Sequence, residues 1–224
     1  ENLIPPVFWM AVWEIAALAV GREFLLPGPV RVGESLLALA RTVDFWLSVG
    51  TTLGRVLLGL AWGTLMGTAL AFLTHFSRWA DRLVSPAVRV VRATPVVSFI
   101  LLVYLWVSRW AIPWVIAGLM VLPVVWGTLS AGLANLDGKL LELARAYRFS
   151  RIKTLRLVYL PSLRPHFCAG LLTAFGLAWK SGVAAEVLCP PDRAIGSRIQ
   201  QAKLGLETAD LFAWTLTIVA LSLL

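Results

Sequence analysis

The chain has 224 residues, of which 59% are hydrophobic and 14% charged, and its net charge is +8. This composition excludes a water-soluble globular protein and is typical of a polytopic membrane protein. Since a spanning helix needs about 20 apolar residues, we expect an all-α membrane fold of about six transmembrane helices. We therefore predict that residues 1–224 form a single transmembrane domain, without a separate soluble one.

The apolar stretches follow one another along the chain with short polar segments between them. A first span over Val7–Val20 is followed by the helix breaker Leu26-Pro27-Gly28-Pro29 and by an amphipathic helix over Arg31–Phe45, which is expected at the membrane surface. The later spans are expected over Thr52–Leu73, Val84–Val107, Pro113–Leu133, His166–Val187 and from Asp210 onward. Both ends of the chain are expected to be incomplete.

Glycines repeat along the second of these spans. They are Gly50, Gly54, Gly59, Gly63 and Gly67. A stripe of this kind predicts that another helix approaches the span closely.

The orientation follows from the positive charges. Residues 78–92 and 139–164 hold more than half of the twenty Lys and Arg residues, and six spans place both segments on one side. The positive-inside rule makes that side cytoplasmic, with the amino terminus also inside. The basic residues lie at span ends without interleaved aromatic platforms, so they do not indicate nucleic-acid binding.

One basic segment carries a specific motif. Glu142-Leu143-Ala144 is followed after three residues by Arg148 and after nine more by Val158-Tyr159-Leu160-Pro161. This spacing resembles the EAA loop of bacterial ABC importer permeases, which reads Glu-Ala-Ala, three residues, Gly, nine residues, Ile, any residue and Leu-Pro. The departures are Leu143, Arg148 and Val158, and Arg148 stands where the family has the glycine that permits a turn.

The resemblance implies a cytoplasmic coupling loop at about residues 137–161, with a short helix over about Lys139–Ser150 seated in an ATP-hydrolysing subunit. The implied contacts with that subunit are Glu142, Leu143, Ala144, Arg145, Arg148, Phe149 and Ser150. The alternative is that this basic loop only sets the topology beside anionic lipid.

Other segments resemble the nitrate/sulfonate/taurine branch of these permeases, among them Gly54–Gly59, Arg92-Ala93-Thr94-Pro95 and Phe175–Lys180. The branch implies a homodimer of permease chains in the inner membrane, two cytoplasmic subunits that bind ATP and Mg, and an extracytoplasmic substrate-binding protein. It also implies uptake of a small solute, anionic or heterocyclic, by alternating access.

The sequence contains no Gly-x-x-x-x-Gly-Lys-[Ser/Thr] and no catalytic or metal-binding motif. We therefore expect a non-catalytic subunit without a cofactor of its own, driven by ATP hydrolysis in another chain.

Ionisable residues inside spans are candidates for the translocation pathway, because charge in hydrocarbon is costly. Lys180, with Ser181 beside it, is expected to line the pathway and attract an anion, and Glu186 is expected to mark the outer gate. The alternative for Lys180 is a structural lysine that snorkels or forms an ion pair.

Two other classes of function compete with an ATP-driven importer. A gradient-driven secondary transporter or channel would normally show repeated halves, and no convincing repeat is present. An intramembrane enzyme would need a nucleophile and a base at membrane depth, and the spans offer only scattered Ser, Thr and Lys180.

Overall fold

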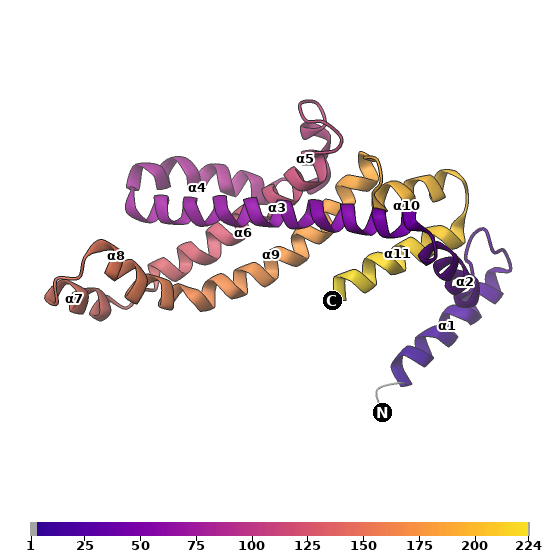
Figure 1. Ribbon diagram of the computed structural model, residues 1–224, viewed down its shortest axis with the longest axis horizontal. Coiled ribbons are helices and arrows are strands. Elements are labelled where there is room, and N and C mark those ends of the chain that lie inside the picture. The colour runs from indigo at the N-terminus through magenta and orange to yellow at the C-terminus, as the bar shows by residue number, and fades with distance from the viewer. Residues whose placement is uncertain (1–3, 224) are drawn as a thin grey trace. The chain divides into compact units, whose positions relative to one another are not determined.

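A computed structural model describes residues 4–223, and all regular structure in that range is helical. The helices, labelled in Figure 1, are α1 (Ile4–Val20), α2 (Pro29–Ala40), α3 (Val43–Phe76), α4 (Arg78–Ala93), α5 (Val96–Val103), α6 (Ile112–Ala134), α7 (Gly138–Ala146), α8 (Arg151–Thr154), the π-helical turn η1 (Leu155–Tyr159), α9 (Leu160–Leu188), α10 (Ile195–Leu204) and α11 (Thr208–Leu223). The all-α prediction is confirmed.

Backbone contacts divide the chain into two compact units. Unit 1 contains residues 1–54 and 183–224, and unit 2 contains residues 55–182. The boundaries fall within the helices α3 and α9.

Three helices of residues 4–223 are long and apolar enough to cross a membrane, namely α3, α6 and the continuous helix Arg151–Leu188. The pair α4 and α5 passes the same criterion together but is bent by 106°, and α1 and α11 are shorter apolar helices. The fourth expected span coincides with α6, and the first and last expected spans correspond to α1 and α11.

The third expected span, Val84–Val107, is not one continuous helix but is broken between α4 and α5. The helix stops at Ala93, and Thr94 adopts an extended conformation with ψ of 131°. Pro95 accounts for the break, because proline disfavours a helical conformation in the residue before it and has no N–H to continue the ladder. α5 then runs in a new direction, as Figure 1 shows.

The fifth span belongs to a helix that begins earlier than His166. Its start is capped by Ser150, whose Oγ accepts a hydrogen bond of 3.3 Å from the N–H of Lys153. From there the helix continues through η1 to Leu188. The charge pattern predicts where the lipid-exposed segment begins. A helix can extend beyond the lipid, so this helix begins earlier than the charge pattern predicted. The amphipathic helix expected over Arg31–Phe45 also differs in its bounds, since α2 ends at Ala40, five residues before Phe45.

In unit 2, the glycines of α3 allow α6 to pack directly against it. A Cβ on Gly59, Gly63 or Gly67 would lie 2.6–2.8 Å from atoms of α6 that include backbone carbonyl oxygens, whereas a Cβ on Gly50 or Gly54 would meet nothing within 4 Å. The prediction of close approach is therefore confirmed for three of the five glycines. α9 also packs against α6, since a Cβ on Gly132 of α6 would lie 2.8 Å from the ring of His166 of α9.

In unit 1, the core joins α2, α3, α10 and α11. Phe45, Val49, Ile195 and Trp214 form a buried cluster. The rings of Phe45 and Trp214 are stacked with centroids 4.9 Å apart.

Candidate functional site

The segment that carries the EAA-like motif begins with a capped helix. The side chain of Asp137 accepts a hydrogen bond of 2.9 Å from the N–H of Lys139, which satisfies one of the free donors at the start of α7. The capping residue lies just before the motif, so the sequence already contained this signal. It fixes the first turn of α7.

α7 presents an apolar face to its surroundings. Leu140, Leu143 and Tyr147 are 41%, 51% and 72% exposed. Residues at these spacings lie on one side of a helix. Sequence reasoning named Leu143 but missed Leu140 and Tyr147, although their spacing was visible. An apolar face of this kind fits a docking surface better than a solvated loop.

The other side of α7 packs within the chain. Ala144 is only 4% exposed, and α7 contacts η1. Glu142 and Arg145 are exposed, and within residues 4–223 the Glu142 carboxylate forms no hydrogen bond or ion pair. Ala144 therefore seats the helix, while Glu142 and Arg145 remain available to a partner.

Arg148 makes the turn that ends α7. It has φ of 48°, in the left-handed region that favours glycine. The N–H of Phe149 donates to the carbonyl of Ala144 at 2.9 Å, and the N–H of Arg148 donates to the carbonyl of Arg145 at 3.0 Å. These two bonds form a Schellman motif. Arginine thus makes a left-handed turn at the position where the EAA pattern that this segment resembles has glycine.

The helix expected over Lys139–Ser150 is therefore too long at its carboxyl end. α7 stops at Ala146, and a turn separates it from α8. Within this turn Phe149 is half-buried, and the Nζ of Lys153 lies 4.3 Å from the centroid of its ring. This cation–π contact holds the turn against α8.

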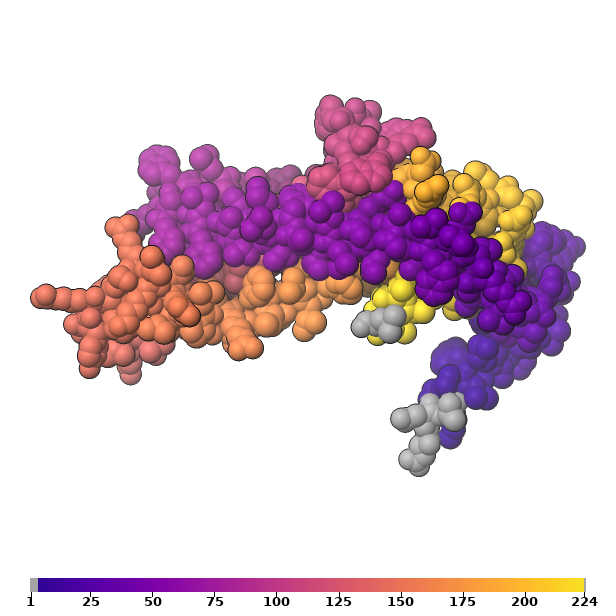
Figure 2. Space-filling model, viewed as in Figure 1, coloured from indigo at the N-terminus to yellow at the C-terminus, as the bar shows by residue number. Residues whose placement is uncertain are grey.

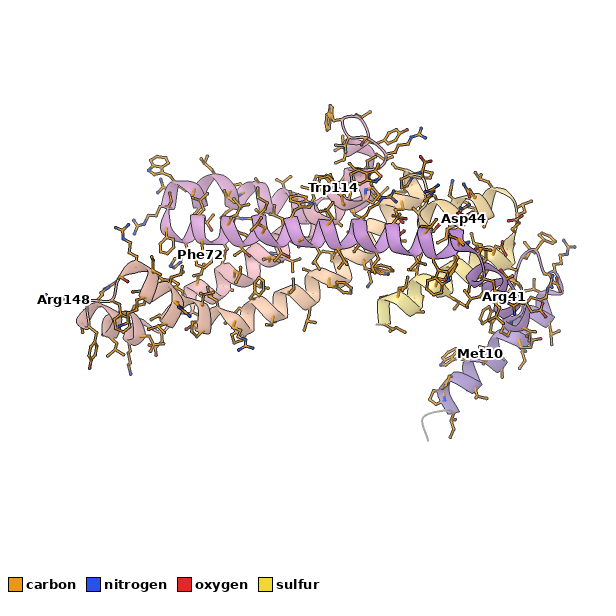
Figure 3. The ribbon with its side chains drawn as sticks, viewed as in Figure 1. Met10, Arg41, Asp44, Phe72, Trp114 and Arg148 are labelled. Carbon is orange, nitrogen blue, oxygen red and sulfur yellow. The ribbon has the colours of Figure 1, made fainter. Side chains whose placement is uncertain are left out.

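Positive charge surrounds the turn. Between residues 138 and 161 Glu142 is the only acidic residue, whereas Lys139, Arg145, Arg148, Arg151, Lys153 and Arg156 are basic. Figure 2 shows this segment as an exposed end of unit 2, and Arg148 lies at its outer tip in Figure 3. The surface combines an apolar face with a basic rim and one carboxylate.

The two pathway candidates on α9 in unit 2 have different surroundings. Lys180 is exposed, whereas Ser181 is buried and its hydroxyl donates to the carbonyl of Leu177 at 2.8 Å. Two residues on, a Cβ at Gly182 would meet Val56 of α3 at 2.9 Å, so the helix is tightly packed at this level. Lys180 is thus accessible, and the Ser181 hydroxyl is engaged by its own helix.

Glu186 lies in unit 1 and is fully buried. Its Oε2 accepts hydrogen bonds from Thr52 Oγ1 at 2.8 Å and from the N–H of Gly196 at 3.3 Å. Thr52 Oγ1 in turn accepts from the N–H of Ile195 at 2.9 Å. Because Ala194 provides no side-chain cap, Glu186 and Thr52 together cap the amino terminus of α10.

Sequence reasoning missed Thr52, and no local signal could have found it. It is 134 residues from Glu186. Lys180 belongs to unit 2 and Glu186 to unit 1, so the two pathway candidates are parts of different compact units.

The searched part of the chain, residues 4–223, contains no group of three or more His, Cys, Asp or Glu that could hold a metal ion. The candidate sites in this part of the chain are suited to binding a partner protein and to the passage of a solute. The exposed face of α7 offers a docking surface, and the long helices of unit 2 carry an accessible cation at Lys180.

Comparison with known proteins identifies relatives over nearly the whole chain. Residues 59–224 match the family described as "Binding-protein-dependent transport system inner membrane component". SsuC of Escherichia coli, named as an aliphatic sulfonates transport permease, is 30% identical over 207 residues, which cover 91% of this chain and 78% of SsuC. The taurine transport system permease protein TauC of the same organism is 25% identical, over 95% of this chain and 79% of TauC. The nitrate import permease protein NrtB of Synechococcus elongatus is 27% identical, over 88% of this chain and 74% of NrtB.

Proposed function

Because this chain belongs to the family of binding-protein-dependent transport system inner membrane components, and is thus a permease subunit of an ABC importer, we propose that α7 couples it to a separate ATPase. The chain is a non-catalytic inner-membrane protein, and its family works with an ATPase and a substrate-binding protein. The alternative of a gradient-driven carrier or channel has no support in these relationships.

The observation that carries the coupling proposal is the exposed apolar face of Leu140, Leu143 and Tyr147 beside an unpaired Glu142. A cleft in the ATPase would bury the apolar face and supply donors to the carboxylate. The proposed contact residues are Glu142, Leu143, Ala144, Arg145, Arg148, Phe149 and Ser150. In this assignment Ala144 and Ser150 act by positioning helices. The buried Ala144 packs α7 within the chain, and Ser150 caps α8.

The proposed assembly contains two copies of this permease, two cytoplasmic ATPase subunits that bind ATP and Mg, and an extracytoplasmic binding protein. The amino terminus lies in the cytoplasm, and residues 1–224 form one functional transmembrane domain with its coupling loop at about residues 137–161. ATP binding draws the ATPases together, the coupling segments follow, and the pathway opens outward to receive solute. This alternation requires that ATP favours one global state over the other.

The proposed solute is a small anion of the sulfonate, nitrate or taurine kind, with a heterocyclic compound as the second candidate. Three relatives are named for aliphatic sulfonates, taurine and nitrate. Lys180 would line the pathway, since it is exposed on a span. Ser181 would fix the local shape of α9, and Glu186 would act at the outer gate by holding α10 in place.

The coupling proposal is tested by co-expressing the chain with its ATPase, purifying through a tag on the permease, and measuring vanadate-sensitive ATP hydrolysis. We expect Glu142→Ala and Leu143→Glu to weaken ATPase association. Leu204→Glu is the matched control, because Leu204 is also apolar and is 75% exposed, but lies on α10, outside residues 137–161. A permease that purifies in good yield with no ATPase bound would instead favour a gradient-driven carrier.

A further inference from the structure

Four arginines lie along one side of α4. Arg78, Arg82, Arg89 and Arg92 are spaced by four, seven and three residues, which places them in one column on a helix. All four are exposed in unit 2. α4 therefore carries a continuous strip of positive charge.

Another face of α4 is apolar. Trp79, Leu83 and Val90 are 74%, 75% and 62% exposed, and they lie roughly 100° from the arginine column. Ser85 and Val88 are 8% and 4% exposed and pack inside unit 2. Ser85 lies between Arg82 and Arg89 on the same side of α4, so the arginine column runs along the edge of the packed side, with the apolar face next to it.

The arginines have little negative charge near them. The only acidic residue of α4 is Asp81, and its Oδ1 accepts a hydrogen bond of 2.5 Å from Ser85 Oγ. Arg82 lies over the ring of Trp79 at 5.4 Å. Across residues 4–223, neither Arg89 nor Arg92 takes part in an ion pair or a side-chain hydrogen bond, so both guanidinium groups have unused donors.

The column reaches α6, a candidate membrane span. α4 contacts α6, and a Cβ on Gly127 of α6 would lie 3.5 Å from Nη1 of Arg92. Gly127 is seven residues before the end of α6, a candidate span, so this guanidinium lies about 10 Å inward from that end. Figure 1 shows α4 turning back from the end of α3, and the helix breaks just beyond Arg92.

An arginine facing hydrocarbon is costly, about 2.5–3.5 kcal/mol on insertion scales at the centre of a span. Two arginines without carboxylate partners therefore point to water or an anionic ligand. The apolar face of Trp79, Leu83 and Val90 is the side of α4 suited to lipid or to another apolar surface.

We propose that the arginine column of α4 binds the transported anion on the inner part of its path, with Arg89 and Arg92 as contact residues. The planar guanidinium fork pairs with the oxygens of a small oxyanion in a bidentate manner. This inference rests on the proposed importer function and specifies its substrate class as anionic.

The column and Lys180 are at different levels of unit 2. Gly182 is two residues after Lys180. A Cβ on Gly182 would lie 3.7 Å from the carbonyl oxygen of Pro113, at the start of α6. Pro113 and Gly127 are about 20 Å apart along that helix. Lys180 would thus meet the anion at one end of the path and the column at the other.

The same guanidinium groups could bind the phosphate of a lipid headgroup, so the test separates a free anion from lipid. A reporter thiol is placed beside the intact column by Ala93→Cys in a Cys168→Ser background, because Cys168 is exposed and Cys189 is buried. Ala87→Cys is the matched control, since Ala87 is also exposed but lies on the opposite side of α4.

The complex with its ATPase is reconstituted in phosphatidylcholine vesicles and treated with an anionic methanethiosulfonate, the sulfonatoethyl reagent, and a cationic one, the trimethylammonioethyl reagent. For Ala93→Cys we expect the anionic reagent to be favoured about tenfold relative to a free thiol, as a focused positive potential allows. Arg89→Gln with Arg92→Gln should abolish this preference, and Ala87→Cys should not show it.

Three outcomes would overturn the inference. The first is an Ala93→Cys thiol that resists both reagents. The second is a preference for the anionic reagent that survives the loss of Arg89 and Arg92. The third is a block of the anionic reagent by added phosphatidylglycerol alone, which would indicate a headgroup site. ATPase association and hydrolysis, measured on the same samples, report on the importer function separately.

Discussion

The backbone N–H of Phe149 donates a 2.9 Å hydrogen bond to the carbonyl oxygen of Ala144 and closes the end of α7. The bond requires Arg148, which lies between them in the chain, to take a left-handed conformation with φ of 48°. The turn thus sets where the exposed face of α7 ends and where α8 begins.

The conformation of Arg148 predicts an order among its variants. Arg148→Gly and Arg148→Asn tolerate positive φ and should keep ATPase association close to that of the unaltered chain. Arg148→Val should weaken it, because a left-handed conformation already costs about 1–2 kcal/mol for an ordinary side chain and is worse for a β-branched one. Co-purification of the ATPase measures the effect. Equal losses in all three variants would show that the charge of Arg148, rather than the turn, is required.

The cap on α10 predicts a stability defect. Glu186→Ala leaves Thr52 Oγ1 and the N–H of Gly196 without the acceptor they use, and should cost about 2 kcal/mol. Glu186→Gln keeps an acceptor oxygen and should cost less. Thermal unfolding of the detergent-solubilised protein distinguishes the variants. If the alanine and glutamine variants unfold at the same temperature as the unaltered chain, Glu186 does not hold α10.

The contact between α3 and α6 predicts a matched pair of glycine variants. Gly63→Val should destabilise unit 2 by about 1–3 kcal/mol, because its Cβ would lie 2.6 Å from the carbonyl oxygen of Gly118. Gly54→Val on the same helix should be tolerated, since a Cβ there meets nothing within 4 Å. The yield of monodisperse protein and its unfolding temperature report the difference. Comparable losses at both positions would contradict close packing as the cause.

The exposure of Lys180 predicts a transport defect without a folding defect. Lys180→Met removes an accessible cation from α9 and should lower uptake of a labelled anion such as taurine or nitrate, while ATPase association is retained. Lys180→Arg keeps the charge and should restore part of the uptake. Unchanged transport kinetics in the methionine variant would remove Lys180 from the pathway.

Several features could be predicted from the sequence because their causes lie within a few residues of one another. Apolar stretches of spanning length imply membrane helices, and the spacing from Glu142 to Pro161 indicates the coupling segment. The glycine stripe anticipated close helix packing at Gly63. The turn at Arg148 was not predicted, since the helix was expected to continue to Ser150. Helix limits were less accurate, because the start at Arg151 depends on a cap and not on hydropathy.

The sequence by itself thus determined the all-α membrane class and the family, and it predicts where a coupling segment lies, since hydropathy and motif spacing are properties of the chain in order. Only the tertiary structure decided that Glu186 and Thr52 cap α10, and that Arg92 lies beside Gly127. These relationships join residues that are distant in the chain. They arise from the packing of whole helices, which the local pattern around any one of these residues does not specify.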